Sequence, residues 1–359
     1  MDTADNLAVW VVTPNGLAVA ETIIAARPDT ILFYTRRLEG QAATGGKCVD
    51  RLGPAVSREF NRFSGHLFIM STGIVVRTVA PLLIHKTTDP AVVVIDDKGQ
   101  FVISLLSGHI GGANRLARDV AAIFGATPVI TTATDVNRKP AIDVIATEKG
   151  LKIENPAAIK TVNMALLLDE PVVVHDPSRW LEDLLPGAVP FSRIEADEAG
   201  SVPTAGVFVD DVTADPPPRM LVLRPPSLVA GIGCNRYTPK EEIRDLLFGT
   251  LGRFGLAPDS ICGIATIDLK SDEAGLVALA ADFDVPLTVF SKDELNQVPD
   301  VPTPSVMVEK HVGVKSVCEA AAILASRNGQ LIVPKQNTRN VTVAIARKDC
   351  TSSGSDPAP

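Results

Sequence analysis

Short apolar runs alternate with helix-like segments along the first 140 residues of the chain. The runs predicted as strands are 7–12, 30–34, 66–70, 91–95, 101–105 and 128–132, and the predicted helices are 17–26, 54–63, 74–79 and 114–124. Aromatic residues make up only 4% of the sequence, so aliphatic side chains must build the cores. Alternation of this kind is typical of a mostly parallel sheet covered by helices. The sequence therefore predicts an α/β fold.

A second block of the same kind begins near residue 227, after a change in composition at about residue 140. Its predicted strands are 228–232, 261–267, 286–290 and 341–346, and its predicted helices are 239–252, 273–281 and 314–327, the first with Thr238 as N-cap. Residues 141–225 contain one clear predicted strand, 171–175, among many prolines. We therefore predict two βαβ domains rich in parallel sheet, residues 1–140 and 226–350, flanking a smaller α/β middle module at 141–225, with a disordered tail at 351–359.

Several classes of protein do not fit the composition. The formal net charge is −8 and no basic block stands out, so a nucleic-acid partner is not expected. The five cysteines are scattered without a C-x-x-C pair, which favours reduced thiols over disulfides or a zinc site. No apolar run approaches the roughly 20 residues that span a bilayer, and the acidic first residues do not resemble a signal peptide. We expect a cytoplasmic protein with neither a membrane nor a nucleic-acid partner.

A glycine-rich loop follows the predicted strand 101–105 and leads into the helix 114–124. Its residues are Ser107, Gly108, His109, Ile110, Gly111, Gly112, Ala113 and Asn114. Glycines let the backbone approach a ligand, and the amides at the start of the following helix suit an anion. His109 is a candidate acid or base, and the flanking serine and asparagine offer hydrogen bonds. A tight turn in which His109 only caps the helix is the alternative, because isolated glycine motifs are weak signals.

Other polar residues follow or flank strands of the first domain. They are Ser71, Thr72, Gly73, Arg77, Lys86, Thr131, Thr132 and Asp135. Ligands of open α/β sheets bind beyond the carboxyl ends of the strands, so these residues are expected to share a pocket wall with the glycine-rich loop. In that pocket Arg77 would bind a carboxylate and Asp135 would orient His109. Capped loops and solvated charges are the alternatives.

The last domain has a matching set of polar loops after its predicted strands. They hold Gly231, Gly233, Cys234, Asn235, Thr266, Asp268, Lys270, Ser291, Ser316 and Glu319. Gly231 and Gly233 resemble half of a dinucleotide fingerprint, but Arg236 stands where the third glycine belongs, which counts against a nicotinamide oxidoreductase. Cys318 has no adjacent histidine to activate it and is interpreted as a packing residue.

Three blocks of the first domain resemble the CbiG family of cobalt-precorrin-5A hydrolases, which act in anaerobic cobalamin biosynthesis. The blocks are HLFIMSTGIVVR at 66–77, Lys86 with DPAVVVID at 89–96, and LLSGHIGGAN at 105–114. The last domain resembles the C-terminal domain of this family and the stand-alone CobE proteins, through GIGC at 231–234, ATIDLK at 265–270, Phe290-Ser291 and SVCEAAA at 316–322. The resemblance extends from about residue 7 to residue 348 and is least distinctive in the middle module.

The resemblance implies a reaction. In this family the ring A δ-lactone of cobalt-precorrin-5A is opened and the C20 carbon leaves with its methyl group as acetaldehyde, which gives cobalt-precorrin-5B. On this interpretation His109 is the acid or base, Ser107 and Asp135 assist it, and the amides of Gly111 and Gly112 stabilise the oxyanion. The other residues named above would bind the substrate, with the cations on its carboxylates.

The same resemblance sets expectations for partners. Cobalt arrives within the tetrapyrrole substrate, so neither a resident cofactor nor a protein metal site is expected. A non-catalytic tetrapyrrole carrier or scaffold of the corrin pathway is the alternative function. A homodimer and transient contacts with other enzymes of the pathway stay open at this level.

Overall fold

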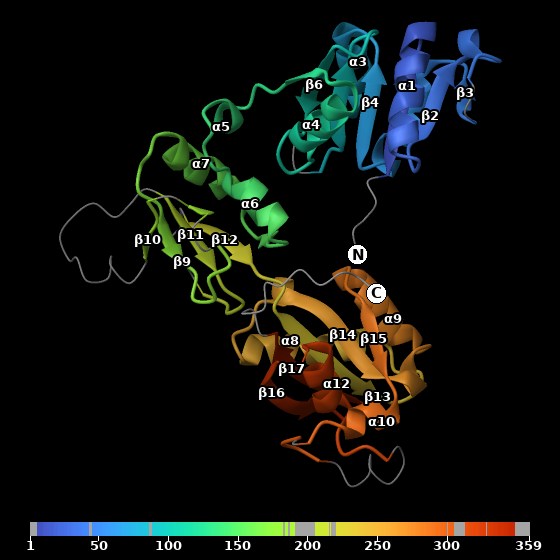
Figure 1. The fold of residues 1–359 in the computed structure, drawn as a ribbon. Helices are drawn as coiled ribbons and strands as arrows, with labels where there is room; N and C mark the ends of the chain where they lie inside the picture. The colour runs from blue at the N-terminus through green and yellow to red at the C-terminus, as the bar shows by residue number, and fades with distance from the viewer. Residues whose placement is uncertain are drawn as a thin grey trace. The chain divides into compact units, whose positions relative to one another are not determined.

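The computed structural model describes residues 6–42, 45–85, 88–181, 184–185, 187–190, 205–214, 216, 220–299, 301–304, 313–327 and 329–348 (Figure 1). The chain divides into two compact units, Met1–Val144 and Ile145–Pro359. The described residues form three sheets, which are mostly parallel and combined with helices, so the predicted α/β class is confirmed. The tail predicted to be disordered, 351–359, lies outside the described residues.

The first unit contains a seven-stranded sheet with the order β3-β2-β1-β4-β5-β6-β7. Its strands are β1 (Leu7–Val11), β2 (Ile31–Thr35), β3 (Lys47–Val49), β4 (Gly65–Ile69), β5 (Ala91–Ile95), β6 (Phe101–Leu106) and β7 (Thr127–Val129). The accompanying helices are α1 (Pro14–Ala26), α2 (Leu52–Glu59), α3 (Thr72–Val79), α4 (Ala113–Phe124) and α5 (Ala133–Val136), while α6 (Ile142–Glu148) runs across the boundary between the two units. Every predicted strand and helix of this region is present, β5 with the predicted ends and the others with shifted ends, whereas β3, α5 and α6 are additional.

Side-chain alternation along the strands explains why helices cover both faces of this sheet. On β1, Val9 and Val11 pack in a cluster with α1 and α4. Ala8 and Trp10 point to the other face and pack with α2 and α3. Both faces of the strand are therefore buried, which is why its sequence reads as a continuous apolar run.

His66 lies in the aromatic cluster of the second face. Trp10 Nε1–H donates to His66 Nδ1 at 3.0 Å, so the proton of the neutral ring is on Nε2, which donates to the Phe60 carbonyl at 3.0 Å. Burial lowers the pKa of His66 to about 4. This histidine is a neutral core residue with both nitrogens paired.

β6 reverses the direction of the sheet. β1, β2, β4 and β5 are parallel, β6 is antiparallel to β5, and β7 is parallel to β6. Residues 96–100 join β5 to β6, and a parallel crossover needs about a dozen residues or more, so only a hairpin fits. The carboxyl ends of β6 and β7 therefore lie at the opposite edge from those of the other strands. The shared pocket wall predicted from the sequence is wrong, because the segment 71–77 and the glycine-rich loop follow strands of opposite direction.

The second unit contains two five-stranded sheets. The sheet of the middle module has the order β10-β9-β11-β12-β8, with α7 (Ile159–Leu167) beside it. Its strands are β8 (Lys152–Ile153), β9 (Val173–His175), β10 (Val189–Pro190), β11 (Gly206–Val209) and β12 (Met220–Arg224). The predicted strand 171–175 is present as β9, with shifted ends. The other four strands were not predicted, because they are short or lie among proline-rich segments.

The other sheet of the second unit has the order β15-β14-β13-β17-β16. Its strands are β13 (Leu228–Cys234), β14 (Ile261–Ile267), β15 (Leu287–Phe290), β16 (Gln330–Asn337) and β17 (Val341–Arg347). On one face lie α8 (Lys240–Arg253) and α9 (Ala274–Phe283), and on the other lie α10 (Lys292–Asn296) and α12 (Val317–Ala325). β16 was not predicted, and Pro239 rather than Thr238 occupies the N-cap of α8.

Asp211 joins the two sheets of the second unit. Its carboxylate accepts hydrogen bonds from Arg347 Nε at 2.7 Å, from Arg347 NH2 at 2.6 Å and from Ser227 Oγ at 2.6 Å. A buried carboxylate held by a bidentate guanidinium is costly to separate from its partner. The predicted boundary between residues 225 and 226 falls inside this unit, between β12 and β13.

Candidate functional site

The glycine-rich loop is closed by its own backbone hydrogen bonds. The N–H groups of Ala113 and Asn114 donate to the carbonyls of Ser107 and Gly108, at 3.1 and 3.0 Å. The Gly112 N–H donates to the His109 carbonyl at 2.9 Å, and Gly112 is left-handed with φ of +81°. The Gly112 amide is thus already paired and does not offer the oxyanion contact predicted for it.

Gly111 has a steric role in this loop. A Cβ atom there would lie 2.4 Å from Ser107 Cβ and 2.9 Å from the Ser107 carbonyl oxygen. Ser107 is itself left-handed, with φ of +58°. The loop therefore folds back on itself and turns the His109 side chain toward the segment that follows β7.

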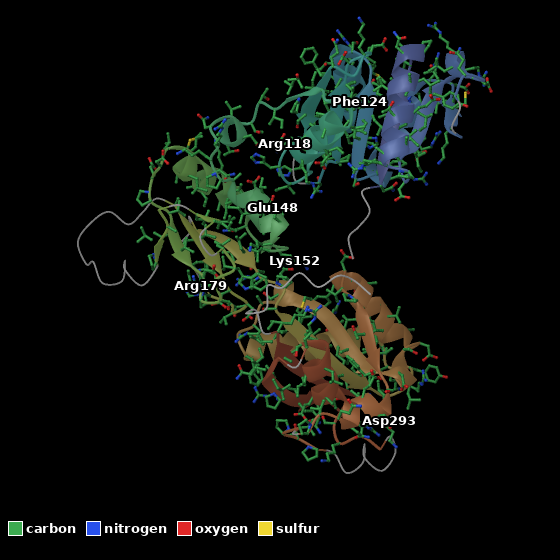
Figure 2. The ribbon with its side chains drawn as sticks, viewed as in Figure 1. Arg118, Phe124, Glu148, Lys152, Arg179 and Asp293 are labelled. Atoms are coloured by element: carbon green, nitrogen blue, oxygen red, sulfur yellow. The ribbon has the colours of Figure 1, made fainter. Side chains whose placement is uncertain are left out.

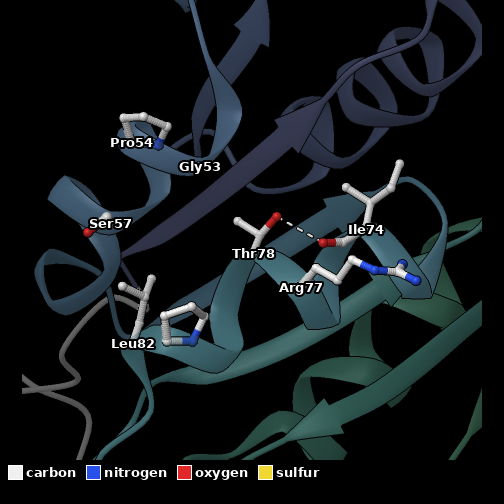
Figure 3. A pocket seen from close by; sticks show the side chains of 8 residues that line it. Gly53, Pro54, Ser57, Ile74, Arg77, Thr78 and Leu82 are labelled. Carbon is white, nitrogen blue, oxygen red and sulfur yellow. Dashed lines mark hydrogen bonds between the residues drawn. The ribbon is translucent and has the colours of Figure 1, made fainter.

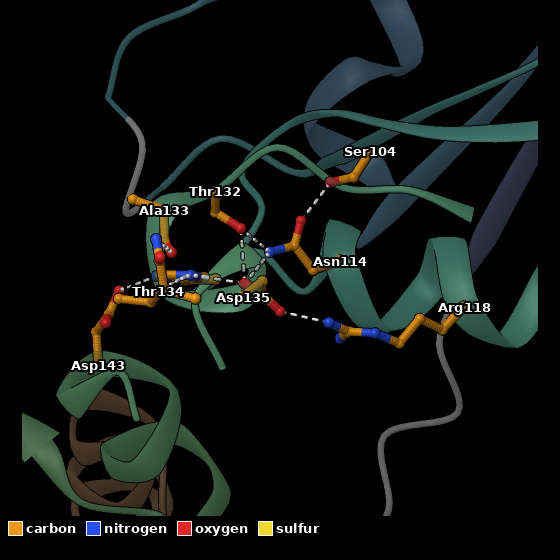
Figure 4. A network of polar contacts seen from close by, with 10 residues as sticks. Ser104, Asn114, Arg118, Thr132, Ala133, Thr134, Asp135 and Asp143 are labelled. Carbon is orange, nitrogen blue, oxygen red and sulfur yellow. Dashed lines mark hydrogen bonds and ion pairs between the residues drawn. The ribbon is translucent and has the colours of Figure 1, made fainter. Parts of the chain in front are cut away.

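His109 bridges two carboxylates (Figure 4). His109 Nδ1 lies 3.1 Å from Asp143 Oδ2, and His109 Nε2 lies 3.2 Å from Asp135 Oδ2. The hydroxyl of Thr134 is 3.1 Å from the same Nε2. Only 17% of the histidine side chain is exposed. The predicted contact between Asp135 and His109 is confirmed, and Asp143 is a second partner that the sequence did not reveal.

This geometry favours the charged imidazolium. The hydrogen bond to Asp143 raises the pKa of His109 above its usual value, and the hydrogen bond to Asp135 acts in the same direction, whereas burial opposes both. Burial would raise the pKa of Asp135, but hydrogen bonds from Thr132 and Arg118 outweigh it and hold that pKa below its ordinary range. Both ring nitrogens lie close to carboxylates, so the surroundings of His109 favour its protonated form.

A wider network fixes Asp135. Thr132 Oγ1 donates to Asp135 Oδ2 at 2.6 Å, and Asn114 Nδ2 donates to the same oxygen at 2.9 Å. Arg118, from α4 (Figure 2), forms an ion pair with the other carboxylate oxygen, Oδ1. Ser104 Oγ donates to Asn114 Oδ1 at 2.6 Å. Strand, loop and helix are thus connected around one carboxylate.

The sequence identified only part of this network. Asn114, Thr132, Asp135 and His109 were predicted, and the structure brings them together. Thr131 is exposed beside them. Ser104, Arg118, Thr134 and Asp143 carry no local motif, and the last is 34 residues from His109 in the chain. Only the hairpin between β5 and β6, which sends β6 and β7 to one edge, places these residues together.

A cavity of about 460 Å³ adjoins the same loop. It is lined by Asn61, Phe63, Ser64, Ile84, Thr88, Asp89, Pro90, Ile110 and Gly111. Ile84 is 79% exposed at its rim. The cavity gives the glycine-rich loop a mixed polar and apolar neighbour at the edge of the sheet where His109 also lies.

The stabilisation that His109 provides is expected to fade as the pH rises. Its pKa in the folded state is raised above the value of an unfolded chain, about 6.5. The stabilisation is therefore complete below about pH 6.5 and is lost as the pH passes the folded-state pKa. We expect the difference in Tm between the wild type and His109→Gln, measured by circular dichroism, to shrink from about pH 6 to about pH 9. A difference that grows over this range would contradict a charged His109.

Arg77 and the residues before it belong to the other edge of the sheet. Arg77 NH1 donates to the Gly73 carbonyl at 2.9 Å. The guanidinium lines a cavity of about 480 Å³ between α2 and α3 (Figure 3), which Ser57, Ile74 and Thr78 also line. Ser71 is the N-cap of α3, which begins at Thr72. Lys86, the other cation predicted to anchor substrate in the first domain, lies outside the described residues.

Loops of the last sheet meet at one edge because β13, β14 and β15 are parallel. At this edge, Cys234 ends β13, Asn235 follows it, Asp268 and Lys270 follow β14, and Ser291 follows β15. Ser291 is engaged in a capping box of α10 with Glu294. Burial raises the pKa of the Cys234 thiol to about 11, so this group is not a nucleophile at neutral pH.

Four other residues predicted to bind substrate are buried inside the last domain. They are Gly231, Thr266, Ser316 and Glu319, all of them buried. Thr266 Oγ1 donates to the Ile232 carbonyl at 2.7 Å. The substrate-binding role predicted for these four residues is wrong, because they have no surface to offer a ligand. Gly233 is half-buried, and a Cβ there would lie 2.7 Å from Thr342 Oγ1.

The Glu319 carboxylate forms hydrogen bonds inside the protein. It accepts hydrogen bonds from the Thr303 hydroxyl and from the Lys335 N–H, the latter at 3.0 Å. Burial would raise the pKa of Glu319, but these hydrogen bonds hold it below its usual value. The carboxylate therefore ties α12 to β16 and to the segment around Thr303.

The described ranges contain neither a candidate metal-binding cluster nor a candidate membrane-spanning helix. No cluster of three or more histidine, cysteine, aspartate or glutamate side chains there could hold a metal ion. No helix in the same part of the chain has both the length and the apolar character that a membrane span requires.

Comparison with known proteins covers most of the chain. The model "Cobalamin synthesis G N-terminal" matches residues 54–135, "Cobalamin biosynthesis central region" matches 140–225, and "Cobalamin synthesis G C-terminus" matches 228–346. A cobalt-precorrin-5A hydrolase of Salmonella typhimurium is 36% identical over 95% of this chain and 97% of its own length. The corresponding protein of Priestia megaterium is 34% identical over 95% of this chain and 94% of its own.

The last domain also matches a shorter protein. Protein CobE of a Sinorhizobium species is 34% identical over 121 residues, which are 33% of this chain and 79% of CobE. The N-terminal family segment contains the glycine-rich loop and Asp135, and the central segment contains Asp143. Because all three segments match in order, and the match extends over nearly the full length of its relatives, the chain belongs to the cobalamin synthesis G (CbiG) family.

Proposed function

We propose that this chain hydrolyses cobalt-precorrin-5A, opening the ring A δ-lactone and releasing acetaldehyde to leave cobalt-precorrin-5B. The observation that carries the proposal is its identity of 34–36%, over 95% of the chain, with two proteins named for that activity. The proposal is also supported by a cavity beside the glycine-rich loop, in which His109 contacts two carboxylates.

His109 is the proton-transfer group in this proposal. Water adds to the lactone carbonyl and loses one proton to the solvent, and the acyl C–O bond breaks to leave a carboxyl group. The departing alkoxide takes a proton from the His109 imidazolium. The neutral imidazole then removes the proton of the C20 alcohol. The C–C bond breaks, its electron pair passes into the macrocycle, and the two-carbon fragment leaves as acetaldehyde. A raised pKa supports the first step. The proton taken from the C20 alcohol restores the imidazolium, which the two carboxylates stabilise.

Incubation of the purified chain with cobalt-precorrin-5A tests the function. We expect acetaldehyde in equimolar amount with the consumed substrate, measured by coupling to alcohol dehydrogenase and NADH, together with the absorbance change of the macrocycle. A substrate-free sample controls for contaminating aldehyde. Tight binding of the macrocycle with no acetaldehyde would contradict the hydrolase and favour the alternative of a non-catalytic carrier.

The proposal extends to the cofactor requirement, the cellular location and the partners of the protein. Cobalt is supplied within the substrate, so the chain needs no resident cofactor. A cytoplasmic location is supported by its scattered cysteines, which suit a reducing compartment. A homodimer and transient contacts with other corrin-pathway enzymes stay as predictions.

A further inference from the structure

Tyr237 is the most exposed large apolar side chain of the described residues. Its relative exposure is 91%, while Trp10 and Phe33 are buried in the core. The residue stands in the loop after β13, at the edge where the loops of the last sheet meet. An aromatic side chain fully in water, in a chain with few aromatics, gains nothing from the hydrophobic effect.

The backbone at Tyr237 is strained and firmly held. Its φ is +61°, a left-handed conformation that costs a residue with a Cβ atom free energy that glycine does not lose. The Tyr237 N–H donates to Glu273 Oε1 at 2.6 Å. Arg236 NH2 donates to the Leu269 carbonyl at 2.6 Å, which ties the loop after β13 to the loop after β14. The exposed ring therefore stands on a rigid turn.

A cation with open hydrogen-bond donors lies beside this turn. Lys270 Nζ and Arg236 NH1 are each 3.6 Å from Glu273 Oε2, an ion-pair distance too long for a hydrogen bond. Glu273 is only 4% exposed, and this oxygen accepts no hydrogen bond from the described residues. The Lys270 ammonium likewise donates to none of them at hydrogen-bond distance. A ligand carboxylate would supply the acceptor that the ammonium lacks.

We infer that Tyr237 and Lys270 form a docking platform for the corrinoid macrocycle, with the Tyr237 ring stacked on the face of the macrocycle and the Lys270 ammonium on one of its carboxylates. The inference rests on the proposed function, which supplies a flat conjugated ligand with an anionic rim. Stacking on an exposed aromatic ring needs no deep cavity. The platform belongs to the second unit and is separate from the His109 network in the sequence.

A second copy of the chain fits this surface less well. The loops around Tyr237 carry the charged side chains of Arg236, Lys270 and Asp272, together with the exposed apolar side chain of Leu269. Interfaces between protein copies have an apolar centre from which charges are depleted. A ligand with an apolar face and an anionic rim matches an aromatic ring surrounded by cations.

Three variants of the full chain test the platform. Tyr237→Gly removes the ring and relieves the left-handed strain, so its Tm should not fall. Tyr237→Phe keeps the ring, and Phe248→Ala removes an aromatic side chain of 44% exposure from α8 in the same unit. Cobalt-precorrin-5A is titrated into each and its absorbance gives Kd. We expect Tyr237→Gly to raise Kd about 10-fold or more, with Tyr237→Phe and Phe248→Ala near the wild type.

Kinetic and binding measurements together distinguish a failure of the docking platform from a failure of the proposed hydrolase function. KM for acetaldehyde release should rise with Kd in Tyr237→Gly while kcat stays unchanged, because the stacking contact would stabilise bound substrate and transition state equally. A wild-type Kd in Tyr237→Gly, with acetaldehyde still released, would overturn the platform and leave the hydrolase intact. A wild-type chain that neither binds the macrocycle nor releases acetaldehyde would overturn both. A changed molar mass in light scattering, with unchanged Kd, would assign Tyr237 to a contact between copies instead.

Discussion

His109→Ala is expected to lower the rate of acetaldehyde release by about 100- to 10,000-fold, the usual contribution of a general acid–base group. The imidazolium is the one group of its network placed between two carboxylates, and alanine leaves no proton to transfer. Single-turnover measurements with saturating cobalt-precorrin-5A give this rate directly. A folded His109→Ala protein with near wild-type turnover would remove His109 from the chemistry.

The variant Asp143→Asn distinguishes chemistry from folding. Asparagine keeps an acceptor for His109 Nδ1–H but removes the negative charge that raises the histidine pKa. We expect the alkaline limb of the pH–rate profile to move to lower pH, while the rate at low pH stays closer to the wild type than in His109→Ala. A uniform loss of rate at every pH would indicate a purely structural role for this pair.

Gly231→Ala is expected to destabilise the second unit by about 3 kcal/mol or more, the upper end of the cost of overpacking a core. A Cβ atom at this position would lie 1.9 Å from the Cys318 carbonyl oxygen and 2.7 Å from Ala322 N, both in the backbone of α12. The helix would have to move off β13, since no side chain there can turn away. Thermal unfolding followed by calorimetry should show the loss, at about 2–4 °C in Tm for each kcal/mol.

Gly249→Ala is the matched control for that experiment. The position is exposed in the middle of α8, and a Cβ atom there would have nothing within 4 Å. Alanine in an exposed helix is more favourable than glycine by about 1 kcal/mol, so the same substitution in the same unit should raise the Tm. A Gly231→Ala protein as stable as Gly249→Ala would refute the close contact between β13 and α12. A glycine that resembled part of a dinucleotide fingerprint therefore has a packing role.

The sequence was sufficient for the α/β class and for most elements of the first unit, because each strand there is a compact apolar run. It also contained the signal for the reversal of β6. The turn at 96–100 is too short for a parallel crossover, and Gly99 is left-handed with φ of +66°. The rule that ligands bind beyond the carboxyl ends of strands would place Arg77 and His109 at one edge only if β4 and β6 were parallel. The hairpin between β5 and β6 puts them at opposite edges.

The remaining parts of the site depend on contacts that no local pattern reveals. Asp143 is separated from His109 along the chain by α4, β7 and α5, and only the tertiary fold brings the two side chains together. The polar side chains of Thr266 and Glu319 look like ligands in the sequence because they follow a strand or begin a helix. Their hydrogen bonds to Ile232 and Lys335 depend on tertiary packing, so the sequence could not separate these structural groups from open ones.

The reversal of β6 has a consequence for how the first unit can evolve. The loops after β1, β2, β4 and β5 form one rim of its sheet, and the loops after β6 and β7 form the other. Substitutions, insertions or deletions on the first rim leave the hydrogen bonds of His109 untouched. Natural selection could therefore reshape the groove around Arg77 for a new partner while the His109 network on the far rim stays intact.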